Sequence, residues 1–400
     1  HEEELQEIIK SYFFEHPKYQ DLENEITKRV KENFTTRPGR RANIIDDNSN
    51  DKWFDENKVN IQFNRAIIFK DYLITNEIIP PLVVDQISSD SDEILSRLAD
   101  PNSKKKSVRG LVYGRVQMGK TTSYSMLINK SIDPGYKLII VLTGISNPLR
   151  RQTQIAMEEN VIGTSTEQEV GSADIGVKKH NKENNSFDFK NIIPITRRDS
   201  DLSQKLAEAL PPLLSQNNEE TAYIFIIKKN TSSLRNINAF FDKSPGMSLR
   251  TKPALIIDDE ADQASLDTKD QRNREVENPT LTNGQIRILL DKFYVNSYVA
   301  YTATPYANIY IGTSGSKIVF NSNIVVKDKS SGKNRIERVD TTSPDEIPSL
   351  FPSNFIISLD PPPNYWGHNE IFRMDHKDRS EDPKKIIPQV IIIDRLEELL

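Results

Sequence analysis

The sequence predicts an α/β protein built around a parallel β-sheet, and two observations lead to that expectation. From Val108 onward, short apolar segments alternate with longer amphipathic ones, the pattern of parallel strands joined by crossover helices. The segment Leu138–Leu142 is apolar throughout, as expected for a strand with both faces covered. The predicted strands are 111–113, 138–142, 192–195, 223–227, 255–257 and 298–301, and the predicted helices are 122–129, 149–158, 202–214, 233–241 and 285–293.

The chain is expected to divide into three parts. Residues 1–105 are predicted to be a mainly helical N-terminal region. Residues 106–312 are predicted to form the α/β lobe, with a polar surface insertion at about 164–191. Residues 313–400 are expected to be an extension of short strands and loops.

Apolar residues recur at helical spacing in two segments of the N-terminal region. The polar stretch 35–55 between them is predicted to be a loop, and Pro80–Pro81 is expected to interrupt the helical pattern. The first segment contains Ile8, Ile9, Tyr12 and Phe13, and the second contains Ile61, Ala66, Ile67 and Tyr72.

Composition limits the classes of function. A net charge of -5 argues against a protein that coats nucleic acid over its whole surface, and it leaves room for a local basic track. The absence of cysteine excludes disulfides and thiolate zinc sites, and it fits a reducing compartment. Because the chain has no run of about eighteen apolar residues and its start, His1–Glu4, is acidic, the expectation is a cytoplasmic protein without a membrane segment.

The segment Gly114–Thr121, followed by Thr122, has the spacing of a phosphate-binding loop: a glycine, four residues, then Gly-Lys-Thr. The glycines permit a tight turn whose N–H groups point at phosphate oxygens. Lys120 would reach the β- and γ-phosphates, and the hydroxyl of Thr121 would bind Mg²⁺. The alternative is an ordinary strand–turn–helix with a lysine at its start. The predicted nucleotide-binding residues are Gly114, Gln117, Met118, Gly119, Lys120, Thr121 and Thr122.

A second candidate site is Ala254–Asp262, an apolar strand that ends in acids. Phosphoryl transfer needs a carboxylate at a strand tip to hold the Mg²⁺ shell and a second one to orient or deprotonate the attacking water. We assign Asp259 to the metal and Glu260 to the water, with Lys120 as the second catalytic residue. Both segments follow strands of one predicted sheet, so they can face one crevice. The alternative is an acidic helix start after a strand.

Several short motifs resemble those of superfamily-two helicases. Asp259–Asp262 spells their D-E-A-D box, and Tyr301–Pro305 resembles their third motif. Leu149–Thr153 resembles the motif that contacts the nucleic-acid backbone. From about residue 60 onward the chain is similar to the Z-one domain family of proposed endonucleases, helicase-like ATPases of bacterial restriction and phage-defence loci. The motifs that carry this similarity are Gly110–Gly114, Val116–Gln117, Gly119–Thr121, Gly135–Lys137, Leu142–Gly144, Asp259–Asp262, Tyr301–Asn308, Leu350–Pro352, Pro361–Gly367 and Ile371–Phe372.

The resemblance implies a RecA-like lobe that hydrolyses ATP with Mg²⁺ and has DNA as its partner, while the residues alone are compatible with DNA or RNA. It assigns Thr302 and Thr304 to coupling between this lobe and a second one. The arginine finger, and the residues of any nuclease, are expected in that second lobe or in a partner protein, because their motifs are absent here. Met118 departs from the family, which more often has a small residue there; this is tolerable for a position that donates mainly its backbone.

Five residues are candidates for nucleic-acid contact. Arg150, Arg151 and Gln152 lie in the helicase-like motif, and Lys228 and Lys229 follow the predicted strand 223–227. A solvated loop explains the two lysines equally well.

The predicted function is a nucleic-acid-stimulated, helicase-like ATPase that serves a DNA restriction or antiviral defence system. One alternative is an ATP-operated switch or scaffold that assembles a defence complex without translocation. Another is a P-loop kinase, which should show an arginine-bearing lid and an acceptor pocket. The motif at Thr302–Thr304 favours the helicase type.

Overall fold

The computed structural model describes most of the chain between Asn43 and Leu359, and these residues belong to one compact unit, Arg41–Leu359. The segment around Ile8, most of the helix predicted over 202–214, and all patterns beyond residue 359 lie outside the described residues. The domain boundaries at residues 105 and 312 stay predictions. The described ranges are 43–46, 53–114, 119–167, 174–184, 187–200, 202, 221–243, 246–263, 265, 280–305, 308, 318–327, 334–342 and 346–359.

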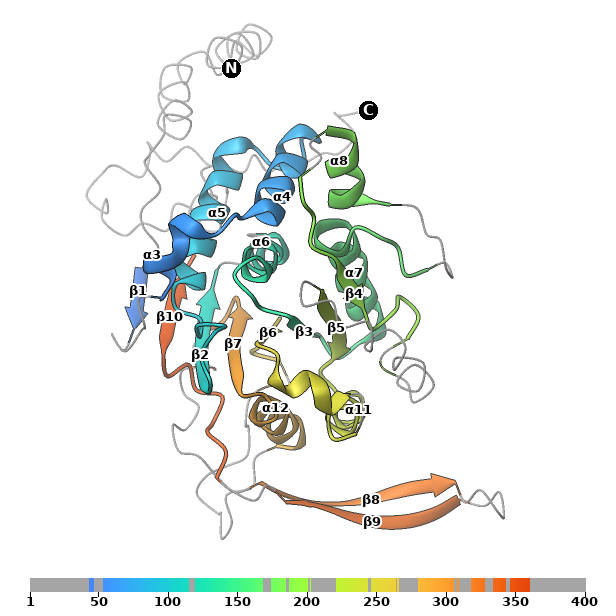
Figure 1. Ribbon diagram of the computed structural model, residues 1–400. Helices are drawn as coiled ribbons and strands as arrows, with labels where there is room; N and C mark the ends of the chain where they lie inside the picture. The colour runs from blue at the N-terminus through green and yellow to red at the C-terminus, as the bar shows by residue number, and fades with distance from the viewer. Residues whose placement is uncertain are drawn as a thin grey trace, which may run out of the picture. The chain divides into compact units, whose positions relative to one another are not determined.

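Within these ranges, the main sheet has eight strands in the order β1-β10-β2-β7-β6-β3-β5-β4 (Figure 1). All neighbours are parallel except β1 and β10, which are antiparallel. The predicted α/β class with a parallel sheet is therefore confirmed, and each of the six predicted strands is present. The strands are β1 (Asn43–Asp46), β2 (Lys106–Tyr113), β3 (Leu138–Thr143), β4 (Ile192–Pro194), β5 (Ala222–Lys228), β6 (Ala254–Asp258), β7 (Val295–Thr302) and β10 (Phe355–Ser358).

Helices cover both faces of this sheet, with α6 and α7 on one face and α11 and α12 on the other (Figure 1). Four helices predicted from the sequence are present, each with bounds a few residues wider or shorter than expected. The described helices are α3 (Trp53–Asn57), α4 (Asn64–Thr75), α5 (Pro81–Leu95), α6 (Lys120–Ile132), α7 (Asn147–Met157), α8 (Gly176–Asn184), α11 (Thr231–Phe241) and α12 (Leu281–Asp291), with the short helical segments η2 (Lys58–Asn60), η3 (Glu158–Ile162) and η4 (Gly246–Thr251).

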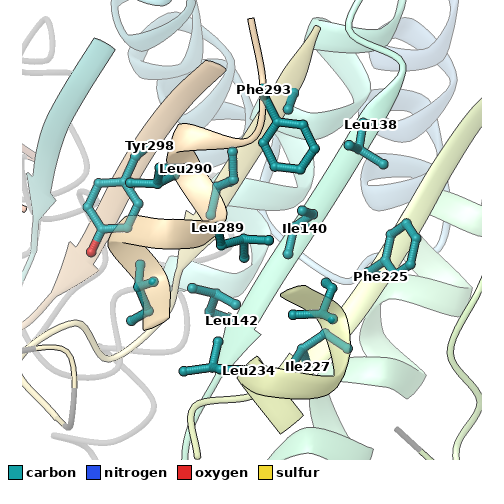
Figure 2. Packing of buried hydrophobic residues seen from close by; sticks show 14 of the residues in the cluster. Leu138, Ile140, Leu142, Phe225, Ile227, Leu234, Leu289, Leu290, Phe293 and Tyr298 are labelled. Carbon is teal, nitrogen blue, oxygen red and sulfur yellow. The ribbon is translucent and has the colours of Figure 1, made fainter. Parts of the chain in front are cut away.

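One hydrophobic core lies between the sheet and the pair α11 and α12. Leu138, Ile140 and Leu142 are alternate residues of β3 and belong to this core, together with Leu234 and Leu289 from the helices (Figure 2). The residues between them on β3 point to the opposite face. Because helices cover both faces, every residue of β3 is buried.

Helices α4 and α5 pack against α6, and α8 packs against α4. Ala66 of α4 is buried as predicted, whereas Ile67, predicted to share its face, is 47% exposed. The helical pattern is interrupted before Pro80–Pro81 as predicted: α4 ends at Thr75, and Pro81 begins α5, where its missing N–H would have no partner in any case. Helix α8 lies inside the predicted insertion 164–191, and it buries Val177, His180 and Asn181.

The predicted loop 35–55 is wrong at residues 43–46, which form β1, and at residues 53–55, which belong to α3. The backbone groups of β1 pair with β10, which lies more than three hundred residues later in the chain, so no local signal marks the strand. Beyond residue 312, β8 (Val319–Lys327) and β9 (Asn334–Thr342) form a separate antiparallel pair. Helices in the described ranges are all too short or too polar to cross a bilayer.

Candidate nucleotide site and basic pocket

The predicted site residues follow strands that end on one edge of the sheet. Since β2, β7, β6, β3 and β5 are parallel, their carboxyl ends lie along the same edge. Gly114 follows β2, Gly144 follows β3, Lys229 follows β5 and Asp259 follows β6. This edge of a parallel sheet is where α/β proteins bind their ligands.

The two ends of the glycine loop have the expected strand-to-helix geometry. Gly114 is buried, and its N–H donates to the carbonyl of Thr302 at 3.1 Å. Gly119 has a φ of 71°, in the left-handed region, and α6 begins at the next residue, Lys120. Residues 115–118, which include the predicted Gln117 and Met118, lie outside the described part of the chain. Thr122 lies in the first turn of α6 and is partly exposed.

Tyr124 links the glycine-loop helix to the acids that follow β6. Its buried hydroxyl donates to Asp259 Oδ2 at 3.2 Å and lies 3.5 Å from Thr121 Oγ1. The two oxygen ligands assigned to one metal ion, on segments 138 positions apart in the sequence, therefore lie on either side of a single hydroxyl group.

The surroundings of Asp259 disfavour its charged form. Burial, followed by the neighbouring charge of Glu260, raises the pKa of Asp259 above its usual value. Lys229, the hydroxyl of Tyr124 and Lys120 act in the opposite direction and lower this pKa without cancelling the rise. The influence of Lys120 on this carboxylate indicates that the first residue of α6 faces the same site.

Glu260 has an unusual backbone and a side chain with an unused oxygen. Its φ is 52°, and its N–H donates to Asp259 Oδ1 at 3.0 Å. Its Oε2 atom is buried and has no hydrogen-bond partner among the described residues. A Cβ atom on Gly144 would lie 3.1 Å from this oxygen and 2.7 Å from Leu149 Cδ1, so a glycine at position 144 leaves the carboxylate its room. A buried carboxylate oxygen without a partner is suited to receive a hydrogen bond from water or ligand.

Thr302 and Thr304, predicted to couple two lobes, both bind the last acid of the D-E-A-D segment. Thr302 Oγ1 donates to Asp262 Oδ1 at 2.8 Å, and Thr304 Oγ1 donates to Asp262 Oδ2 at 2.7 Å. Burial raises the pKa of Asp262, but the hydroxyls of Thr304 and Thr302 outweigh burial and hold it below its usual value. The end of β7 is thereby tied to the turn after β6.

Lys229 is not a nucleic-acid contact, because its side chain points into the protein. The residue is 1% exposed. Its ammonium donates to the carbonyls of Asp259 and Glu260, each at 2.6 Å, and forms an ion pair with Asp258 Oδ1 at 2.8 Å. Two hydrogen bonds and one ion pair therefore surround the ammonium with oxygens inside the fold.

Three of the other candidate nucleic-acid residues, Arg150, Arg151 and Lys228, line a pocket where β3 and β5 end on the same edge. Its volume is about 790 Å³. It lies at the starts of α7 and α11, whose N-caps are Ser146 and Asn230. Helix N-termini and basic side chains together favour anions. The lining residues are Asn147, Pro148, Arg150, Arg151, Arg198, Asp199, Ser200, Leu202, Lys228, Ser232, Ser233 and Asn236.

The cations of this pocket differ in how they are held. Arg150 is buried, and its guanidinium donates to the carbonyls of Arg197 and Arg198, so it mainly shapes the pocket wall. Arg151 is exposed and pairs with Glu167 at 3.3 Å. Lys228 donates to Asn147 Oδ1 at 2.6 Å.

Gln152 is exposed on α7 and does not line the pocket. Arg198, which the sequence analysis did not single out, lines it and pairs with Glu158 and Glu167. No sequence signal marks Arg198. Tyr124 was also missed, although its spacing from Thr121 places both residues on one face of α6. Asp262 was named as part of the D-E-A-D segment but was given no role of its own.

No protein-family model and no curated protein sequence matches this chain. The similarity to the Z-one domain family therefore rests on the short motifs described above.

Proposed function

We propose that this chain is a RecA-like P-loop ATPase of the helicase type. The observation that carries the proposal is the position of the Tyr124 hydroxyl between Thr121 and Asp259. A chance Gly-Lys-Thr turn has no reason to lie beside acids at the tip of another strand. In a phosphate-transfer site the two must meet, because they hold the same metal ion.

In this proposal, Gly119, Lys120 and the first N–H groups of α6 bind the phosphates of ATP, with Gly114, Gln117, Met118 and Thr122 completing the loop. Thr121 and Asp259 supply a hydroxyl and a carboxylate oxygen, ligands that suit Mg²⁺.

Among the described residues, no group of three or more His, Cys, Asp or Glu side chains gathers around one point. A nucleotide-bound Mg²⁺ needs none, since one or two protein ligands suffice beside phosphates and water. Its contribution when bound is to neutralise charge on the phosphate oxygens.

Glu260 is the proposed general base. Its buried Oε2 has no partner among the described residues, so it can accept a proton from an attacking water. Asp262, Thr302 and Thr304 connect this turn to the end of β7. We propose that they transmit the state of the nucleotide to a second lobe or a partner protein, which supplies the arginine finger.

The pocket at α7 and α11 is the proposed contact for nucleic acid. Arg151, Arg198 and Lys228 line it, and cations beside two helix starts suit a phosphodiester backbone. Service in a DNA restriction or antiviral defence system, with DNA as the nucleic acid, is the part of the proposal that rests on the family resemblance alone.

The test is ATP turnover of the purified protein with and without duplex DNA. Turnover that requires Mg²⁺ and rises with DNA supports the helicase-type motor. Turnover that DNA leaves unchanged favours the alternative, an ATP-operated switch or scaffold. If the protein neither binds nor hydrolyses ATP, the proposal is wrong.

A further inference from the structure

We propose that Lys229 is a positioning residue: its buried ammonium holds the acid turn Asp258–Glu260 in the conformation that directs Glu260 into the nucleotide site. The inference rests on the proposed function for its catalytic consequence. Its structural part stands on contacts that are independent of any nucleotide.

The first step is that the oxygens around the Lys229 ammonium all come from one short turn. The Lys229 side chain is fully buried, and each of its oxygen partners belongs to one of the three consecutive residues of the turn. Two partners are main-chain carbonyls, so the lysine fixes the path of the backbone directly. Asp258 supplies the compensating charge, and its second carboxylate oxygen accepts from the hydroxyl of Tyr298 at 2.6 Å.

The second step is backbone strain at Glu260. Of the non-glycine residues in the described ranges, only Glu77 and Glu260 have a positive φ, and that of Glu260 is 52°. A non-glycine residue in the left-handed region is strained, and it persists where surrounding contacts hold it. Lys229 provides such contacts. Its ammonium donates to the carbonyl of Asp259, which precedes Glu260, and to the carbonyl of Glu260 itself.

The third step is what this backbone achieves. With φ positive, the Glu260 side chain lies beside Gly144 at the end of β3, where Oε2 is buried without a partner among the described residues. The main-chain N–H of Glu260 meanwhile bonds Asp259 Oδ1. One conformation therefore sets both the acid assigned to the metal and the acid assigned to the water.

The fourth step concerns why charged residues, Lys229 and Asp258, occupy these buried positions. A buried ion pair contributes little net stability compared with apolar residues of similar shape, because both charges lose their hydration. Stability alone therefore gives no reason for a lysine at position 229. A flexible chain that ends in three donors does give a reason, since no apolar side chain can bind two carbonyls.

The test uses the double variant Lys229→Met with Asp258→Asn, which removes both charges and leaves no unpaired ion. The matched control is Lys130→Met. Lys130 is another buried lysine, which donates to the carbonyl of Ser88 and pairs with Asp92, and it lies on the last turns of α6. Three quantities are measured in each protein: thermal midpoint, ATP affinity in EDTA, and single-turnover hydrolysis with Mg²⁺.

We expect the double variant to fold and to keep its metal-free ATP affinity, while hydrolysis falls about a hundredfold, since a small misplacement of a catalytic group has an effect of this size. Lys130→Met should lower the thermal midpoint without a matching loss of hydrolysis. Hydrolysis by the double variant within about threefold of the wild-type rate would overturn the proposal.

A crystal structure of the double variant separates this inference from the proposed function. If the wild-type protein does not bind ATP, the proposed function fails, and the structure still decides the role of Lys229. Relaxation of Glu260 to a negative φ supports the inference. Retention of the positive φ and of the turn without the lysine contradicts it.

Discussion

Along the edge where the parallel strands end, the part at β2 and β6 (the acidic end) differs from the part at β3 and β5 (the basic end) in charge and in exposure. At β2 and β6 the charged groups are mostly acids, and Asp258 and most of Asp259 are withdrawn from solvent. At β3 and β5 the charged groups are mostly cations, arranged around an open pocket. Lys228 and Lys229 show how sharply the two ends separate: these neighbours point in opposite directions, one lining the pocket and the other bonded to the acid turn.

The difference teaches that each end has its own requirement. In the proposed function, the acids must act on a metal ion, and their charges act more strongly where solvent screens them weakly. A surface for a nucleic-acid backbone needs cations that remain accessible and sensitive to salt. Substitutions at one end should therefore leave the binding reaction of the other end intact, and this separation can be tested.

The largest effect is expected from Lys120→Ala. Removal of the ammonium from the start of α6 leaves the phosphates without their point charge, so ATP turnover should fall to background. Binding of duplex DNA in the absence of nucleotide, measured by fluorescence anisotropy, should stay within about twofold, because the pocket is untouched. Undiminished ATP affinity and turnover would remove this lysine from the site.

The variants Glu260→Gln and Asp259→Asn should have different effects, one on hydrolysis and the other on Mg²⁺-dependent binding of ATP. Glu260→Gln keeps the shape but not the base, so hydrolysis should fall about a hundredfold or more while Mg²⁺-dependent ATP binding is retained. Asp259→Asn should instead weaken the dependence of ATP affinity on Mg²⁺, measured by calorimetry with and without EDTA. Turnover of Glu260→Gln close to wild type would place the base elsewhere.

At the basic end, Arg151→Glu should weaken DNA binding and reduce its salt dependence. Loss of one phosphate contact lowers the slope of log affinity against log salt by about one. Gln152→Glu is the matched control, since it adds charge at the next residue of α7, exposed but outside the pocket lining. Equal effects of the two variants would mean that only the general charge of this surface matters.

The smallest effect is expected where β7 meets the acid turn. Thr302→Val removes a donor to Asp262, which should cost about 1 kcal/mol in the free energy of unfolding at pH 7. Because the folded-state pKa of Asp262 lies below its usual value, this contribution is present above the unfolded pKa of about 3.9 and is lost as the pH falls through the folded value.

The difference between wild type and Thr302→Val should therefore shrink in urea unfolding curves recorded at decreasing pH. Thr302→Ser keeps the hydroxyl and should follow the wild type. A difference that is constant from pH 7 to about pH 3 would show that packing, and not the hydrogen bond to the carboxylate, accounts for the loss.

Much of the sheet could be predicted from the sequence, because its central strands carry their own signal. The apolar runs of β3 and β5 are buried on both faces and leave no other interpretation. Strands β1 and β10 were not predicted, since each has only four residues and their pairing depends on residues far apart in the chain.

In the candidate site, too, some features could be predicted from the sequence and others could not. The positions of Thr121 and Asp259 could be expected from strand ends and motif spacing, and the structure brings them to one hydroxyl. The inward direction of Lys229 could not, because a lysine after a strand usually faces solvent. Its partners are main-chain carbonyls, which no sequence pattern displays.

The place of β10 beside β2 also affects how the protein is made. β2 leads into the glycine loop, and β10, which begins at Phe355, pairs with one edge of β2. Just before β10, Asn354 accepts a hydrogen bond from the N–H of Arg109, a residue of β2 that lies 245 positions earlier. At roughly 5–20 residues per second, a ribosome needs about ten to fifty seconds to cross that distance. Throughout this interval β2 presents an open hydrogen-bonding edge, the kind of surface through which nascent chains associate. A gene fragment that stops before residue 355 would make that exposure permanent, so β2 depends for its solubility on a strand that is synthesised more than two hundred residues later.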